Sequence, residues 1–113
     1  MEKASHIFVK DNELEWENVG EGVDRKILGY NGDLMMVRVR FEKGAIGAAH
    51  SHPHRQVTFV EAGKFTVDIG EEKSELQAGD SFIVPADAVH GVVAEEAGIL
   101  IDVFTPQRED FLK

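Results

Sequence analysis

The sequence has no cysteine, only three prolines, and far fewer basic than acidic side chains. Without cysteine, disulfide bonds and thiolate-ligated zinc or iron–sulfur sites are impossible, so any metal must be held by nitrogen or oxygen atoms. No apolar run approaches the length of a membrane-spanning helix, and residues 1–12 lack the apolar core of a signal peptide. We therefore expect a soluble, cytoplasmic protein with no membrane partner.

The charge balance restricts the partners further. With 21 acidic and 12 basic residues, the formal net charge is −9, which repels nucleic acids and anionic lipids. A small anionic ligand would need a locally positive site to overcome this field. At 113 residues the chain predicts a single domain spanning 1–113 with one core, which excludes a two-domain enzyme.

Short segments rich in Val, Ile, Phe and Thr alternate with glycine-containing breaks, which is typical of an all-β protein. We expect strands at 25–30, 34–41, 56–61, 64–70, 81–84, 91–94 and 99–104. Asn31-Gly32 predicts a hairpin between the first two strands because both residues accept positive φ. So many short strands must close into a small barrel or jelly roll, since an open sheet would leave its edges exposed.

One helical turn is expected at the end of the chain. Thr105 would be its N-cap and Pro106 its first residue, where the missing N–H of proline costs no hydrogen bond. No other helix is predicted.

Four of the five histidines fall in two places, three of them between positions 50 and 54 and the fourth at His90. Residues two apart on a strand share a face, so His50, His52 and Gln56 can point to one spot, and a neighbouring strand could bring His90 opposite. Such a cluster is a typical site for a divalent transition metal. Taken alone, a pair such as His50-x-His52 is more often a solvated surface feature than a metal site.

Two spaced motifs surround these histidines. They read Gly44-x5-His50-x-His52-x3-Gln56-x6-Gly63 and Gly79-x5-Pro85-x-Asp87-x2-His90-x3-Ala94. The chain resembles the cupin superfamily in these motifs, at about 44–63 and 79–94, and over roughly residues 34–104. Gln56, Asp87 and Ala94 stand where that family usually has Glu, Gly and Asn.

The resemblance implies a double-stranded β-helix (jelly-roll) barrel and a metal held by His50, His52, Gln56 and His90. Three neutral imidazoles and an amide would leave the charge of the ion uncompensated, so the site would attract a carboxylate. The metal stays open among Ni, Zn, Fe, Mn and Co. In an alternative interpretation the site is metal-free and Gln56 only forms hydrogen bonds.

Two histidines lie outside this ligand set. His54 is the next candidate ligand. The preferred interpretation, however, is that it supports the metal ligands from behind or faces the substrate. His6, in the polar N-terminal segment, is expected to be solvated.

Further runs at 22–28, 34–37, 50–56 and 100–112 are similar to KdgF-type cupins, the small proteins of pectin and alginate breakdown that linearise unsaturated uronates. This resemblance implies isomerase-like opening of a 4,5-unsaturated monouronate to the linear 5-keto-4-deoxyuronate. It assigns Asp102 the acid/base role and Phe104 and Arg108 the substrate contacts. Leu100, Asp102 and Phe104 share one strand face, so the apolar neighbours should raise the pKa of Asp102.

Two other functions stay open at this point. A three-histidine iron site would permit a cupin dioxygenase, and a cupin without catalysis would bind a sugar or effector unchanged. The resemblance also implies a homodimer. Val57 and Phe59, opposite in parity to Gln56, would either fill the interior or form the contact between subunits.

Overall fold

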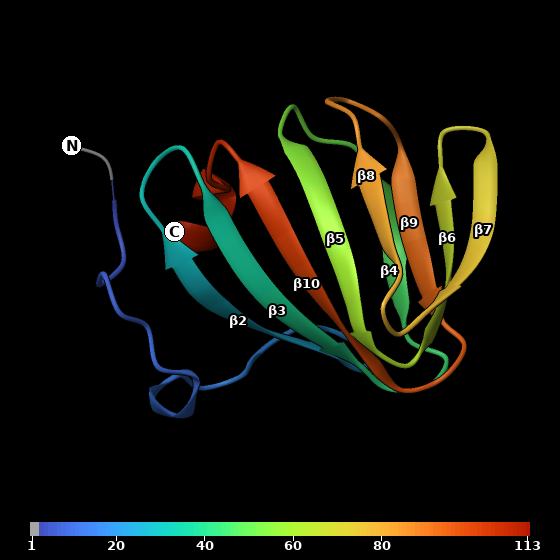
Figure 1. Ribbon diagram of the computed structural model, residues 1–113, viewed down its shortest axis with the longest axis horizontal. Helices are drawn as coiled ribbons and strands as arrows, with labels where there is room; N and C mark the ends of the chain where they lie inside the picture. Colours follow the sequence, from blue (N-terminus) through green and yellow to red (C-terminus); the bar gives the residue numbers. More distant parts are fainter. Residues whose placement is uncertain (1–2) are drawn as a thin grey trace.

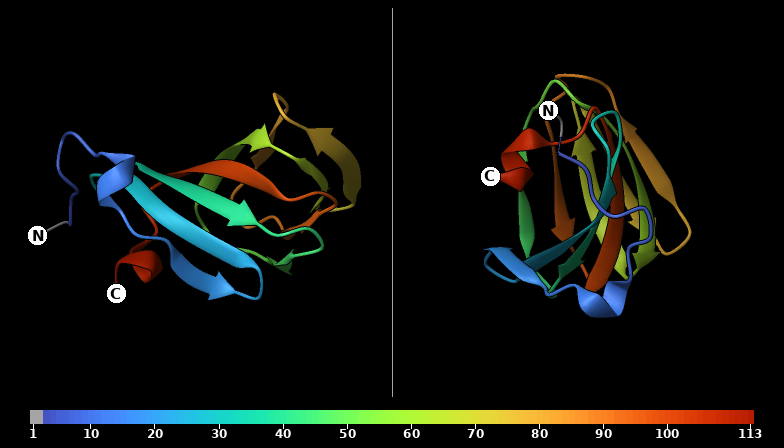
Figure 2. Two further views of the ribbon diagram at one scale, coloured as in Figure 1. Left: turned by 90° about the horizontal axis from the view of Figure 1, so that it is seen from below. Right: turned by 90° about the vertical axis from the view of Figure 1, so that its left-hand side faces the viewer.

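Ten strands form two antiparallel sheets in the computed structural model, which describes residues 3–113 (Figure 1). The larger sheet has the order β1 (Glu17–Gly20), β2 (Val23–Tyr30), β3 (Met35–Phe41), β10 (Gly98–Thr105), β5 (Arg55–Ala62) and β8 (Ser81–Val84). The smaller sheet has the order β4 (Ile46–His50), β9 (His90–Ala94), β6 (Lys64–Ile69) and β7 (Glu72–Gln77). The two sheets curve around a common interior (Figure 2), which is the predicted jelly-roll barrel.

Every predicted strand is present, with its ends within two residues of those expected. The alternation on β3 also holds, since Met35, Val37 and Phe41 are buried while Met36 and Arg40 are exposed. The hairpin between β2 and β3 forms as expected. Of the Asn31-Gly32 pair, however, only Gly32 has a positive φ, at 90°.

The sequence did not predict β1, β4 and β7, which lie at the edges of the two sheets. Their residues are almost all exposed, so they lack the alternation of apolar and polar side chains that identifies a half-buried strand. Polar or short strands at sheet edges protect against pairing with other chains. A short 3-10 turn, η1 (Asp11–Glu13), was also not predicted.

The C-terminal turn is present but tighter and later than expected. Thr105 is the last residue of β10 rather than an N-cap, and the turn is a 3-10 helix, η2 (Glu109–Leu112). The intervening residues are held away from helical geometry by Gln107. Its backbone N–H donates to the Gly32 carbonyl at 2.9 Å, and its side-chain oxygen accepts from the Gly32 N–H at 2.7 Å.

Buried apolar side chains form two clusters inside the barrel. The larger comprises Val23, Phe41, Ala45, Val60, Phe65, Val67, Ala94 and Leu100, and the smaller Met35, Val37 and Phe104. Leu100 and Phe104 belong to different clusters although both lie on one face of β10. The side chain between them on that face is Asp102, so a polar region separates two apolar ones.

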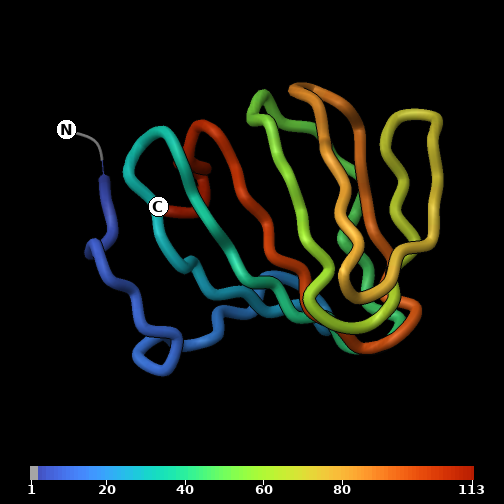
Figure 3. The backbone as a smooth tube through the Cα atoms, in the orientation of Figure 1, coloured from blue at the N-terminus to red at the C-terminus, as the bar shows by residue number. Residues whose placement is uncertain are grey.

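The N-terminal segment runs beside β2 (Figure 3), where the Ser5 backbone N–H donates to the Tyr30 carbonyl at 2.9 Å. His6 is exposed, as predicted. Within the described part of the chain, none of the helical segments has the length and apolar character needed to cross a bilayer.

Candidate active site

Three of the predicted histidines meet at one end of the barrel. His50 is the last residue of β4 and pairs in register with His90, the first residue of β9. His52 lies in the loop after β4, so it reaches the cluster through that loop and not through strand parity, which corrects the expected route. One nitrogen from each ring lies within 4.8 Å of the others, an arrangement that could hold a metal ion.

The hydrogen bonds of the rings fix which nitrogen faces inward. The Nδ1 atoms of His50, His52 and His90 each lie 2.8–3.0 Å from a backbone carbonyl oxygen. Because a carbonyl only accepts, each Nδ1 carries the hydrogen and each neutral ring keeps its lone pair on Nε2. Burial lowers the pKa of His52 and of His90, which favours the neutral form that binds metals.

A second acceptor faces one of these lone pairs. The Gln56 Oε1 lies 3.1 Å from the His52 Nε2, while the Gln56 Nε2 donates in the other direction, to the Thr58 hydroxyl at 2.8 Å. Two lone pairs pointing at each other repel unless a proton or a cation lies between them. The donor set therefore fits a divalent cation bound by nitrogen and oxygen.

The histidine loops are tied together at a position where the sequence departs from the cupin pattern. Asp87 replaces the usual glycine and has a φ of 67°, a left-handed conformation that Asp tolerates better than most residues. Its backbone N–H donates to the His52 carbonyl at 2.8 Å. This bond connects the loop before His90 to the loop that carries His52.

Asp102 lies on β10 directly opposite Thr58 of β5, on the interior face. The Thr58 hydroxyl donates to its Oδ1 at 2.6 Å, and the Gln56 amide donates to the same atom at 3.3 Å. Burial raises the pKa of Asp102 from 3.8 to about 6, although the Thr58 hydrogen bond and the charge of Arg108 oppose the shift. The predicted effect of its surroundings is thus confirmed, and a carboxyl with this pKa can exchange protons near neutral pH.

Phe104 and Arg108 lie next to the acid. The Arg108 guanidinium lies 5.1 Å from the centre of the Phe104 ring and 4.3 Å from that of Phe111, and it donates twice to the Asp110 carboxylate, at 3.0 and 2.8 Å. Although it follows the last strand, Arg108 is only 9% exposed. The aromatic rings and Asp110 therefore hold the charge in place at the site.

A cavity of about 360 Å³ connects these groups. Its lining includes His50, Gln56, His90, Asp102, Phe104 and Arg108. The sequence did not indicate Arg25 of β2, which also lines the cavity and stacks at 3.9 Å on the Phe111 ring. Two arginines thus line the cavity of a chain of charge −9. Each also pairs with a carboxylate, Arg25 with Glu17 at 2.8 Å and Arg108 with Asp110 at 2.8 Å.

A larger groove, of about 770 Å³, lies elsewhere, between the N-terminal segment and the outer side of β2 and β3, and none of the predicted site residues lines it.

His54 lies beside the cluster and is not part of the histidine group. Its Nε2 is 3.1 Å from the Gln107 carbonyl, and its Nδ1 is buried without a hydrogen-bond partner among the described residues. Sequence reasoning also missed Thr58, although it shares the parity of Gln56 on β5.

Comparisons with known proteins agree with the motifs. A model of the cupin domain matches residues 37–104. The pectin degradation protein KdgF of Dickeya dadantii (strain 3937) is 49% identical over an alignment of 104 residues, and the match covers 90% of this chain and 94% of that protein. The chain belongs to the cupin family, in its KdgF group.

Solved cupin structures of the same size superpose on almost the whole chain. An RmlC-like cupin from Shewanella frigidimarina has a TM-score of 0.93 at 45% identity, covering 96% of this chain and 97% of the other. KdgF from a Halomonas species has a TM-score of 0.90 at 39% identity, covering 95% and 99%. The cupin fold predicted from the two motifs is therefore confirmed.

Proposed function

We propose that this cupin opens the ring of 4,5-unsaturated monouronates, giving linear 5-keto-4-deoxyuronates. The observation that carries the proposal is the position of Asp102, whose pKa is raised to about 6, in the same cavity as His50, His90 and Arg108. Similarity to a protein named for pectin degradation supports uronates as the substrate class.

The reaction is an isomerisation and needs no oxidant or cosubstrate. The anomeric hydroxyl loses its proton, the bond from C1 to the ring oxygen breaks, and C1 becomes an aldehyde. The electron pair left on the ring oxygen forms the C5 ketone as the double bond shifts, and C4 takes up a proton. Reactant and product therefore have the same atoms, and the protein must move one proton between two positions.

Asp102 is the group proposed to move that proton. As a carboxylate it accepts the hydroxyl proton, and as an acid it delivers a proton to C4. A pKa near 6 populates both forms around neutral pH, and such acid/base catalysis typically contributes about 10²- to 10⁴-fold in rate.

Arg108 is proposed to bind the uronate carboxylate through its planar guanidinium, and Phe104 and His54 to contact the sugar. The rings of Phe104 and Phe111 limit the movement of the arginine. A substrate carboxylate would therefore be held in one orientation relative to Asp102.

His50, His52, Gln56 and His90 are proposed to hold one divalent transition metal among Ni, Zn, Fe, Mn and Co. When bound, such an ion acts as a Lewis acid that stabilises negative charge developing on a substrate oxygen. The neutral ligand set leaves its charge available to an anionic substrate.

The test follows the ultraviolet absorbance of the conjugated alkene in the unsaturated monouronate, with metal-loaded protein and without oxygen. The expected result is a decay faster than the spontaneous reaction and equally fast in air. A decay that requires air would indicate a dioxygenase instead. Binding of the uronate with an unchanged decay rate would indicate a cupin that only binds its ligand, and would overturn the proposed reaction.

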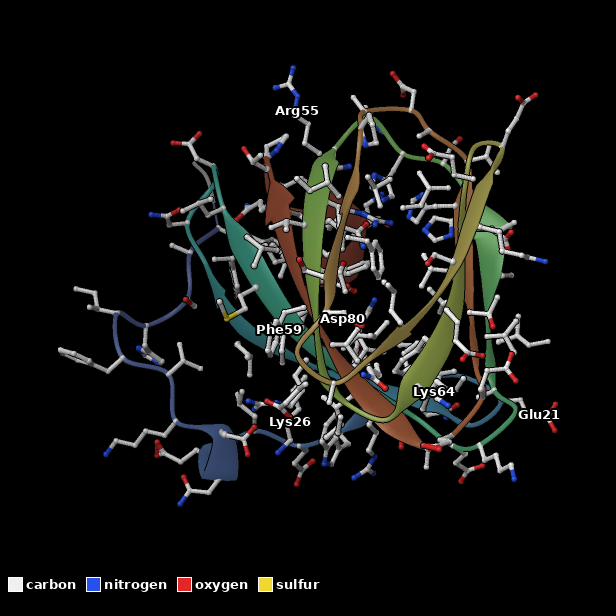
Figure 4. The ribbon with its side chains drawn as sticks, turned by 45° about the vertical axis from the view of Figure 1, so that its right-hand side comes forward. Glu21, Lys26, Arg55, Phe59, Lys64 and Asp80 are labelled. Carbon is white, nitrogen blue, oxygen red and sulfur yellow. The ribbon has the colours of Figure 1, made fainter. Side chains whose placement is uncertain are left out.

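We further propose a homodimer, formed through the outer face of the larger sheet. Val57 and Phe59 are 42% and 48% exposed, so they do not fill the interior, and Figure 4 shows Phe59 on β5. Cytoplasmic location stays a prediction from the sequence.

A further inference from the structure

Thr58 occupies a buried position between the proposed ligand Gln56 and the proposed acid Asp102. It is fully buried, and the strand register places it opposite Asp102 and two residues from Gln56 on the same face of β5. Its hydroxyl bonds to both neighbours, at 2.8 and 2.6 Å. The apolar side chains expected at such an interior position would offer neither bond.

The number of hydrogens determines the direction of each bond. A hydroxyl has one hydrogen, and the short contact to the Asp102 Oδ1 uses it. The other contact must then be donated by the Gln56 Nε2, which places the Gln56 amide nitrogen away from the histidines. The amide oxygen is consequently the atom that faces the His52 Nε2.

We propose that Thr58 is a positioning residue that presents the oxygen of Gln56, and not its nitrogen, to the metal while holding the Asp102 carboxylate at the same time. The inference rests on the metal site of the proposed function but not on the reaction. Groups that orient metal ligands commonly change metal affinity by about 10- to 100-fold when removed.

The number of hydrogens available for these bonds also explains why position 56 has an amide where cupins usually have glutamate. A carboxylate at position 56 would bring a second acceptor to the single Thr58 hydrogen, and it would face the Asp102 carboxylate, which now receives the Gln56 amide at 3.3 Å. Gln56, Thr58 and Asp102 therefore form a set in which every donor meets an acceptor. Replacing one member by a group without a matching hydrogen disrupts the other two.

Calorimetric titration of metal-free protein with Zn²⁺ tests this inference through Thr58→Val, which keeps the shape but removes the hydroxyl, and Thr58→Ser, which keeps the hydroxyl. The expected dissociation constant rises about 10-fold or more for Thr58→Val and stays within about 3-fold for Thr58→Ser. Zinc affinity of Thr58→Val equal to that of the wild type would overturn the inference. Equal losses in both variants would assign the effect to packing and would also overturn it.

Nuclear magnetic resonance of the wild type keeps the inference testable if Thr58→Val does not fold. The Gln56 side-chain amide protons are expected to show nuclear Overhauser effects to the Thr58 side chain, and their absence would contradict the proposed orientation. Failure of the ring-opening assay with zinc affinities as expected would reject the reaction and leave the role of Thr58 intact.

Discussion

At the residue scale, the site depends on polar atoms that are matched one by one. Three backbone carbonyls fix the histidine tautomers, and one hydroxyl connects Gln56 to Asp102. The cost of this arrangement is a carboxyl group held in surroundings that disfavour its charged form. The unfolded chain would titrate that group near 3.8, whereas its pKa in the folded protein is about 6. Ionisation of Asp102 therefore lowers the free energy of unfolding.

Asp102→Asn in metal-free protein is therefore expected to be more stable than the wild type at neutral pH. Between pH values of about 4 and 6 the folded wild type keeps a proton that the unfolded chain releases, so its free energy of unfolding falls as the pH rises through this window. Above the window, removing the charge should raise the free energy of unfolding by roughly 1–3 kcal/mol. Asparagine still offers an oxygen to the Thr58 hydroxyl.

Urea unfolding with a chelator present, compared near pH 7.5 and below about pH 4, measures this difference. The extra stability of Asp102→Asn should disappear in acid, where Asp102 is protonated in both the folded and the unfolded wild type. An asparagine variant that is less stable at neutral pH, or whose difference does not change with pH, would show that Asp102 is not held in a desolvating environment.

At the element scale, strands with one buried face could be predicted and strands at the edges could not. Met35, Val37 and Phe41 alternate with polar residues on β3, whereas β1 and β7 have no buried face to produce a pattern. The paths of the loops were the other feature that the sequence did not predict. The sequence predicted that His50 and His52 converge, but the loop that brings His52 inward depends on a contact with Asp87, which lies distant in sequence.

Asp87 provides a prediction at this scale, because its φ of 67° suits few residues other than glycine. Asp87→Val should lower the free energy of unfolding by about 1–2 kcal/mol, whereas Asp87→Asn, which tolerates the same conformation, should change it little. Chemical denaturation of the two variants beside the wild type makes the comparison. If valine and asparagine gave equal stability, the left-handed conformation would not be a feature of the folded protein.

At the scale of the whole molecule, the two motifs sufficed to predict the cupin family and the jelly-roll barrel, because each motif spans a connection between the two sheets, from β4 to β5 and from β8 to β9. The two hydrogen bonds between Gln107 and Gly32 could not be predicted, since they join segments 75 residues apart through the backbone and side chain of one residue. The predicted start of the C-terminal turn, at Thr105 and Pro106, was wrong for the same reason. Pairings between distant segments leave no local pattern in the sequence.

The outer face of the larger sheet is the basis for the proposed dimer. Strand register aligns one row across four strands, comprising Met36, Val103, Val57 and Ile83. Ile101 and Phe59 lie beside it in the next row. An apolar surface of this kind commonly contacts another protein surface, and a two-fold axis would place the row against its own copy.

Light scattering should give the mass of a dimer for the wild type and of a monomer for Phe59→Lys and Ile83→Lys. The control is Ile46→Lys, a similar change at a residue that is 62% exposed on the smaller sheet, which should stay dimeric. A monomeric wild type, or a dimer that survives both substitutions on the outer face, would contradict this assembly.

Asp102 is proposed to transfer the proton in a cavity that it shares with the metal and the uronate. The most direct test compares the ring-opening rate of metal-loaded wild type and Asp102→Asn, with metal content and uronate affinity measured on the same samples. We predict that the variant keeps its metal and binds the uronate, while its turnover falls about 10²- to 10⁴-fold. Turnover equal to that of the wild type, with metal and substrate bound, would contradict the account.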